Sequence, residues 1–207
     1  MLTHLQLKKP IILAICGKSA TGKTRLSRWL VSDLTAHGVK CREIVSDTTR
    51  PPRPGEVDGK DYHFVSEEEF ANRKHLEESI FRNWHYGTPE DAIKDGINIG
   101  VFNTDGMKSL LSYRRKYVII PVLLEDKLIV RLHRSYDREG KWHWEYVRRV
   151  MADRKDFKRF KKRYLPLFKD TILLENIDGV IAKSNAIYQV IKNFFVTPGQ
   201  ARIKPLK

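Results

Sequence analysis

The 207-residue sequence predicts an α/β fold in which a parallel five-stranded sheet is flanked by helices. Apolar runs bounded by turn residues alternate with helical patterns, and a glycine-rich loop stands between the first run and the first helical pattern. This alternation is typical of parallel sheets whose strands are connected through helices. The predicted strands are residues 11–16, 40–45, 97–102, 117–122 and 171–174.

The first helix is predicted directly after Gly22. Four apolar residues follow at helical spacing, and Gly38 ends the pattern because glycine is a common helix terminator. We expect this helix to bury one face, made of Leu26, Trp29, Leu30 and Leu34.

Two segments interrupt the alternation. A run rich in proline and glycine, residues 48–59, leads into an alternating stretch and indicates a small insert rather than a linker. A charged and aromatic segment between two later helical patterns indicates a lid. We expect a single domain with a core, an insert, a lid and a tail, at residues 8–46 with 96–196, 47–95, 134–146 and 197–207 respectively.

The net charge is +14, which favours polyanionic partners such as nucleotides, nucleic acid or lipid headgroups. The longest apolar run, residues 11–16, is too short to cross a bilayer, and the first residues lack the pattern of a secretory signal. The two cysteines show neither metal-binding spacing nor a disulfide framework. We therefore expect a cytoplasmic protein with no membrane partner.

The glycine-rich loop GKSATGKT matches the phosphate-loop pattern G-x-x-x-x-G-K-[ST] in its required place between strand and helix. Its backbone N–H groups and the helix dipole can bind phosphate, and Lys23 can reach the β- and γ-phosphates. The hydroxyl of Thr24 is the predicted ligand of Mg²⁺. The predicted ATP-binding residues are Gly17, Lys18, Ser19, Ala20, Thr21, Gly22, Lys23 and Thr24.

Residues 46–64, SDTTRPPRPGEVDGKDYHF, resemble the signature of the guanylate kinase family along their whole length. Arg50 and Arg53 provide permanently charged forks that suit the oxygens of a monophosphate, and Tyr62 adds a phenolic donor. The resemblance implies a P-loop NTPase core in which the insert binds a nucleoside monophosphate, the phosphoryl acceptor.

Residues 75–89 resemble the family segment that reads the acceptor base. The resemblance assigns Glu77, Ser46 and Thr88 to the base and Tyr86 to the acceptor phosphate. Guanine presents two adjacent donors, N1–H and its 2-amino group, which one carboxylate can accept together. The resemblance therefore implies a guanine nucleotide as the acceptor.

Two features depart from the family pattern. Alignment on Gly106 places Val101 and Asn103 at two positions that are usually acidic, which puts strict guanine selection in doubt. The lid is longer than usual and contains tryptophans, which we expect to pack within it. Arg134 and Arg149 resemble lid arginines that close over the transferring phosphoryl group, so we assign them, with Lys23, to catalysis.

The sequence thus predicts Mg²⁺-dependent transfer of phosphate from ATP to GMP or dGMP. One alternative is a kinase for another or modified nucleoside monophosphate. Another is a non-enzymatic interaction module, although the intact phosphate loop disfavours it. Nucleic-acid binding is disfavoured because no known binding motif is present, and the chain is expected to be a monomer or homodimer. The predicted acceptor-binding residues are Ser46, Arg50, Arg53, Tyr62, Glu77, Tyr86, Thr88 and Asn103.

Overall fold

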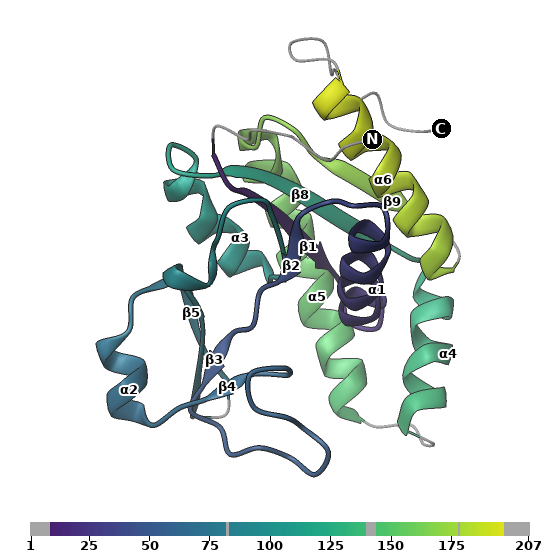
Figure 1. Ribbon diagram of the computed structural model, residues 1–207. Helices are drawn as coiled ribbons and strands as arrows, with labels where there is room; N and C mark the ends of the chain where they lie inside the picture. The colour runs from purple at the N-terminus through teal and green to yellow at the C-terminus, as the bar shows by residue number, and fades with distance from the viewer. Residues whose placement is uncertain (1–8, 82, 140–143, 178, 197–207) are drawn as a thin grey trace.

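The computed structural model describes residues 9–81, 83–139, 144–177 and 179–196 (Figure 1). A five-stranded sheet in the order β2-β7-β1-β8-β9 forms the centre, and every strand pair in it is parallel. The predicted fold class and all five predicted strands are confirmed. The strands are β1 (Ile11–Gly17), β2 (Cys41–Glu43), β7 (Ile97–Val101), β8 (Val118–Glu125) and β9 (Ile172–Glu175).

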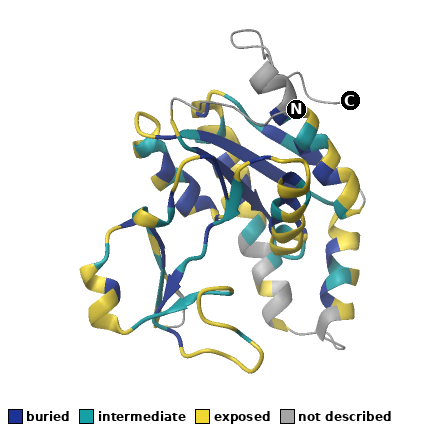
Figure 2. Ribbon diagram, viewed as in Figure 1, coloured by how far each residue is buried: buried dark blue, intermediate teal, exposed yellow. Residues whose placement is uncertain are grey.

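Helices cover both faces of this sheet, and β1 is completely buried between them (Figure 2). Because side chains alternate along a strand, its odd-numbered residues face one layer and its even-numbered residues face the other. The odd-numbered residues pack with α1 (Lys23–Ala36) and α6 (Val180–Val196). The even-numbered residues pack with α3 (Thr104–Leu110) and α5 (Trp144–Arg163). Burial on both faces explains why the central strands are continuous apolar runs.

The predicted buried face of α1 is wrong at one position. Leu26, Leu30 and Leu34 are buried, but Trp29 is 43% exposed. The three leucines are four residues apart and form one continuous row, whereas position 29 lies to the side of that row. Ser27 is buried on the other side of the row, where its hydroxyl donates to Glu43 Oε1 at 2.9 Å.

A second sheet forms within the predicted insert, in the order β4-β3-β6-β5. Its longest strands, β5 and β6, are an antiparallel pair. The short helix that precedes β5 begins with a capping box, in which Ser66 and Glu69 bind each other's backbone N–H groups. The elements are β3 (Asp47–Thr48), β4 (His63–Phe64), α2 (Glu67–Asn72), β5 (His75–Phe81), β6 (Trp84–Pro89) and a 3₁₀ turn, η1 (Glu90–Ala92).

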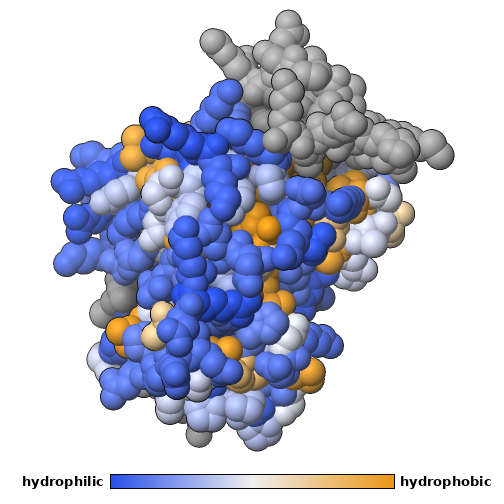
Figure 3. Space-filling view, turned by 60° about the vertical axis from the view of Figure 1, so that its left-hand side comes forward, coloured by the Kyte–Doolittle hydropathy of each residue, from blue (hydrophilic) through white to orange (hydrophobic). Residues whose placement is uncertain are grey.

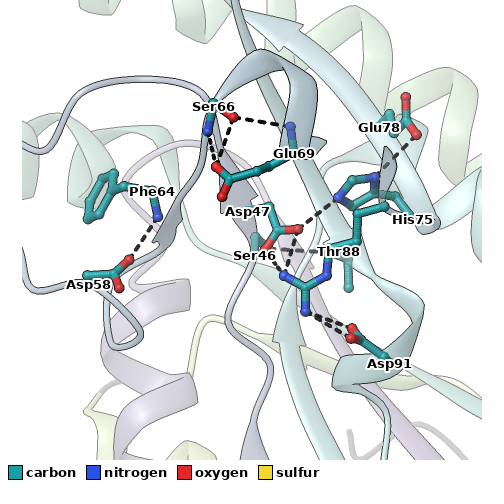
Figure 4. A network of polar contacts seen from close by, with 11 residues as sticks. Ser46, Asp47, Asp58, Phe64, Ser66, Glu69, His75, Glu78, Thr88 and Asp91 are labelled. Atoms are coloured by element: carbon teal, nitrogen blue, oxygen red, sulfur yellow. Dashed lines mark hydrogen bonds and ion pairs between the residues drawn. The ribbon is translucent and has the colours of Figure 1, made fainter. Parts of the chain in front are cut away.

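A buried carboxylate ties the segments of the insert together (Figure 4). Asp47 is fully buried and accepts hydrogen bonds from Arg73 Nη1 at 2.9 Å and from His75 Nε2 at 3.0 Å. Arg73 also binds Asp91 through Nη2 at 2.8 Å. The network therefore joins β3, the start of β5 and the turn that follows β6.

We expect Asp47→Ala to lower the free energy of unfolding by about 3–5 kcal/mol, because it removes the buried partner of His75 and leaves Arg73 with only the exposed Asp91. The control is Asp91→Ala, since the side chain of Asp91 is 65% exposed. Its loss is expected to cost under about 1 kcal/mol. Urea unfolding measures both values, and equal losses would contradict the assignment of Asp47 as the centre of the network.

The predicted lid coincides with the ends of two helices. Residues 134–139 belong to α4 (Leu128–Glu139), and residues 144–146 begin α5. Trp144 is 75% exposed, so the expectation that it packs within the lid is wrong. Trp142 and the predicted tail, residues 197–207, lie outside the described residues.

The face of the molecule drawn in Figure 3 is mainly hydrophilic. On the face drawn in Figure 3, hydrophobic residues form small separate groups among polar and charged ones. Within the described ranges, no helix combines the length and the apolar character needed to cross a membrane.

Candidate active site

The phosphate loop connects the last residue of β1, Gly17, to the first residue of α1, Lys23. Ala20 and Gly22 have positive φ values of 62° and 84°, and this left-handed backbone turns the chain sharply into the helix. A Cβ atom on Gly17 would lie 2.8 Å from the carbonyl oxygen of Leu124. Glycine at position 17 therefore allows the start of the loop to lie directly against β8.

The polar groups of the loop are held close to its backbone. Lys23 Nζ donates to the carbonyl oxygens of Gly17 at 2.8 Å and of Lys18 at 3.0 Å. Burial lowers the pKa of Lys23. The Ser19 N–H donates to Asp153 Oδ2 at 2.7 Å, and Thr24 is exposed on the first turn of α1. Gly22 has no side chain with which to bind the free amides of that turn, so an anion can bind them.

A cavity of about 640 Å³ opens beside this loop. Its walls come from the loop, the insert, the start of α3 and the middle of α5. It brings Gly17, Ser19 and Lys23 together with the predicted acceptor-binding residues Ser46, Arg50, Arg53, Tyr62, Glu77, Tyr86 and Asn103.

One wall of the cavity carries a chain of hydrogen bonds around Glu77. Thr88 is buried on the neighbouring strand and donates its hydroxyl to Glu77 Oε1 at 2.8 Å. Ser46 Oγ lies 3.4 Å from the Thr88 hydroxyl. Burial raises the pKa of Glu77, although the Thr88 hydrogen bond partly offsets that effect. The three residues predicted to read the base therefore form one connected group.

Glycine at position 106 allows α3 to approach Glu77 closely. A Cβ atom there would lie 3.1 Å from Glu77 Oε2. Asn103 caps this helix, because its Oδ1 accepts a hydrogen bond from the Gly106 N–H at 2.7 Å. The side-chain oxygen of Asn103 is therefore already engaged in capping α3, although the residue also lines the cavity.

A cationic group, Arg50, also lines the cavity. Arg50 is buried, and its Nη2 donates to Glu56 Oε1 at 2.9 Å. Its guanidinium lies 5.6 Å from the centre of the Tyr62 ring, and its buried Nε has no hydrogen-bond partner among the described residues. Arg53 is exposed, and Tyr86 contacts Tyr62 edge to face with ring centres 5.8 Å apart.

The protonation states at this end of the cavity follow from its contacts. Burial raises the pKa of Tyr62, so its phenol keeps its proton and can act as a donor. The Arg53 backbone N–H and the Arg50 guanidinium lower the pKa of Glu56, which therefore stays ionised. An acceptor phosphate would meet arginine and phenol donors here, with Glu56 holding Arg50 in position.

Sequence reasoning did not assign the acidic residues on the helical side of the cavity. Asp153 and Asp156 on α5 and Asp105 on α3 all line it. The two α5 residues are three positions apart and so share one face of the helix. The three-residue spacing could have indicated two carboxylates on one helix face, but the surrounding stretch is dominated by lysine and arginine.

Of the two predicted lid arginines, Arg134 is not among the described residues that line this cavity. Arg134 lies on α4 and binds Asp126 Oδ2 through Nη1 at 2.6 Å. Arg149 lies on α5, and its side chain is outside the described part of the structure. Their catalytic roles stay predictions.

Sequence comparisons place this cavity in a known context. The family model described as Guanylate kinase matches residues 7–101, which include the loop and the insert. The guanylate kinase of Maricaulis maris is 36% identical over 171 residues, or 68% of this chain and 75% of that protein. The guanylate kinase of Wigglesworthia glossinidia brevipalpis is 32% identical over 201 residues, or 90% of this chain and 95% of that protein.

A structural comparison gives the same fold. The crystal structure of guanylate kinase from Anaplasma phagocytophilum superposes with a TM-score of 0.61 at 19% sequence identity, covering 93% of this chain and 90% of that one. The structural likeness supports the fold, and the sequence relatives support the ancestry. The chain belongs to the guanylate kinase family.

Proposed function

We propose that the protein transfers the γ-phosphoryl group of ATP to GMP or dGMP, which yields ADP and GDP or dGDP. The observation that carries this proposal is the single cavity that joins the phosphate loop to Glu77 and Arg50. The relatives named guanylate kinase agree with it.

The Glu77 wall suits guanine. An ionised carboxylate can accept the N1–H and the 2-amino group together, and Thr88 holds one of its oxygens in place. Adenine has an acceptor at N1, which would face the carboxylate unfavourably and leave a buried polar group unpaired. The hydroxyl of Ser46 beside Thr88 is assigned to the oxygen edge of the base.

The Arg50 end suits the acceptor phosphate. A guanidinium can bind two phosphate oxygens in parallel, and Arg50 lines the cavity. Arg53, Tyr62 and Tyr86 add donors around it. This position orients the acceptor phosphate towards the loop that holds the donor.

The phosphate loop binds the donor. Backbone N–H groups of the loop and the start of α1 bind the β- and γ-phosphates, and Lys23 adds its charge where negative charge develops during transfer. The transfer is a direct in-line step in which the acceptor phosphate oxygen bonds to the γ-phosphorus as the bond to the β-phosphate oxygen breaks. Catalysis then rests on positioning and charge stabilisation.

Mg²⁺ is the expected companion of ATP, and its role is to neutralise charge on the β- and γ-phosphate oxygens. The ion prefers oxygen ligands and usually binds one or two protein groups together with phosphates and water. The Thr24 hydroxyl on the first turn of α1 is such a donor, and carboxylates line the adjoining cavity. The residues present fit the ion.

The lid, the partners and the location remain predictions. Arg134 and Arg149 are proposed to add charge around the phosphoryl group, and Arg134 must first leave Asp126 to do so. ATP and a nucleoside monophosphate are the proposed partners, and a monomeric or homodimeric state and a cytoplasmic location are expected.

Arg50→Lys tests the phosphate end. We expect the KM for GMP to rise about tenfold, because an ammonium cannot replace a bidentate guanidinium that contributes roughly 1.5–3 kcal/mol. The KM for ATP should stay close to that of the wild type. Arg115→Lys, at an exposed position, is the matched control. Steady-state kinetics with each substrate varied would contradict the assignment if both KM values rose equally.

The acceptor panel tests the proposed function itself. Release of ADP is measured with Mg²⁺ and ATP against GMP, dGMP and the other common ribo- and deoxynucleoside monophosphates. GMP and dGMP are expected to give the highest kcat/KM. Faster turnover of another monophosphate would favour the alternative substrate. The absence of both turnover and ATP binding would favour an interaction module.

A further inference from the structure

A carboxylate from α5 reaches the backbone of the phosphate loop. Asp153 Oδ2 accepts the 2.7 Å hydrogen bond from the Ser19 N–H, a contact between residues 134 positions apart in the sequence. The same oxygen lies 3.8 Å from Arg131 Nη1, and the Asp153 side chain is only 19% exposed. An anionic group of the chain itself therefore binds one of the loop amides.

The partner of Asp153 is a group that the donor nucleotide also needs. Ser19 is the third residue of the loop, and the loop amides are the groups that bind donor phosphates. A carboxylate oxygen and a phosphate oxygen are the same kind of acceptor for an N–H donor. Two anions held at one N–H would also repel each other at close range. Asp153 and a donor phosphate therefore compete for the Ser19 N–H.

Asp153 also affects the lysine of the loop. Asp153 and Lys23 line the same cavity, so the negative charge of Asp153 acts near the Lys23 ammonium. A donor phosphate would supply the same negative charge beside Lys23. The carboxylate thus matches a phosphate in its hydrogen bond to the loop and in its charge near Lys23.

The part of α5 that follows Asp153 is anchored in the core. Phe157 and Phe160 follow Asp153 on the helix and are buried in the core, with exposures of 5% and 0%. The two phenylalanines therefore anchor α5 in the core just beyond Asp153, so the carboxylate reaches the loop from a fixed part of the helix.

We propose that Asp153 occupies the place of a donor phosphate at the Ser19 N–H and that ATP must displace it in order to bind. Asp153 thus lowers the affinity of the loop for ATP. This inference rests on the proposed function only in that the loop binds ATP.

Calorimetric titration with ATP and Mg²⁺, without any acceptor, tests the proposal. Asp153→Ala is expected to bind ATP about five- to tenfold more tightly than the wild type, because a hydrogen bond to a charged group no longer has to break first. The KM for ATP in the phosphoryl-transfer assay should fall in the same direction.

The matched control is Asp156→Ala, which removes the same charge from the same helix and cavity. Asp156 lines the cavity, but no hydrogen bond joins it to Ser19 in the described structure. We expect the Asp156→Ala variant to gain no more than about twofold in ATP affinity, because it loses only a charge that the solvent screens. If Asp153→Ala does not fold, Asp153→Asn keeps the size of the side chain and should still bind ATP more tightly than the wild type.

Two outcomes would overturn the proposal. Unchanged or weaker ATP binding by the folded Asp153 variants would show that the residue supports the loop or the metal ion instead. An equal gain in the Asp156 variant would show that cavity charge, rather than the Ser19 contact, controls affinity. Because the titration contains no acceptor, the comparison of ATP affinities would stand even if the guanylate kinase assay showed no turnover.

Discussion

Lys23→Met is expected to reduce kcat/KM for phosphoryl transfer by on the order of 10²–10³, the loss that follows removal of one donor to developing transition-state charge. Methionine preserves most of the side-chain length and removes the charge and the hydrogen bonds to Gly17 and Lys18. The measurement is the steady-state rate with saturating GMP and varied ATP.

The fold should survive this substitution. Lys23 is partly buried with a lowered pKa, so its charged form is already disfavoured by burial. Lys169→Met, at an exposed position, is the control and should retain wild-type activity. A folded Lys23→Met enzyme with at least half of the wild-type kcat/KM would remove the phosphate loop from the mechanism.

Glu77→Gln is expected to lower kcat/KM for GMP by on the order of 10³, because the amide of glutamine presents donors to the N1–H and amino donors of guanine. The neighbouring Glu78→Gln is the control, since the Glu78 side chain is 58% exposed and points to the other face of β5. Its kcat/KM is expected to stay close to that of the wild type. Comparable losses in the two variants would refute the role of Glu77 in base recognition.

The Glu77→Gln substitution should not destabilise the protein at neutral pH. Burial raises the pKa of Glu77, so the fold favours the protonated form. A raised carboxyl pKa stabilises the folded state below the unfolded pKa, and this contribution is lost as pH rises through the folded value. Glutamine mimics the neutral form, so its melting temperature at pH 7 should equal or exceed that of the wild type.

Base recognition should depend on pH because the pKa of the Glu77 carboxyl is raised. Only the ionised carboxylate of Glu77 can accept both guanine donors. The KM for GMP should therefore rise as pH falls through the raised pKa of Glu77, above the ordinary range of a glutamate. In Glu77→Gln this rise should be absent.

The central sheet was predictable because the patterns that specify it lie within short stretches of the sequence. Strands buried on both faces must be apolar throughout, and the loop sequence between β1 and α1 has few other uses. The two-residue strands β3 and β4 are too short for a reliable periodicity, and β3 exists through its pairing with β4 and β6. The Asp47 network was equally hidden, because Arg73 and His75 are 26 and 28 residues away in the sequence.

The site was predictable where a residue pattern repeats a known motif. Arg50, Tyr62 and Glu77 were identified through resemblance, and the structure places all three at one cavity. Asp153 could not be found in this way, because its partner, Ser19, lies on a distant element and its own helix resembles a solvated basic face. The ion pair of Arg134 with Asp126 also depends on how α4 leaves β8, which the local sequence does not encode.

An internal competition is the most direct test of the central claim that one cavity joins ATP to a guanine monophosphate. The protein is incubated with Mg²⁺, γ-³²P-labelled ATP and equimolar GMP, AMP, CMP and UMP, and the labelled diphosphates are separated by chromatography. The label must move to the acceptor, so ADP formed from ATP itself stays unlabelled. The predicted result is label in GDP almost alone, lost in Lys23→Met and Glu77→Gln. Label mainly in another diphosphate, or GDP labelling that survives Glu77→Gln, would contradict the account.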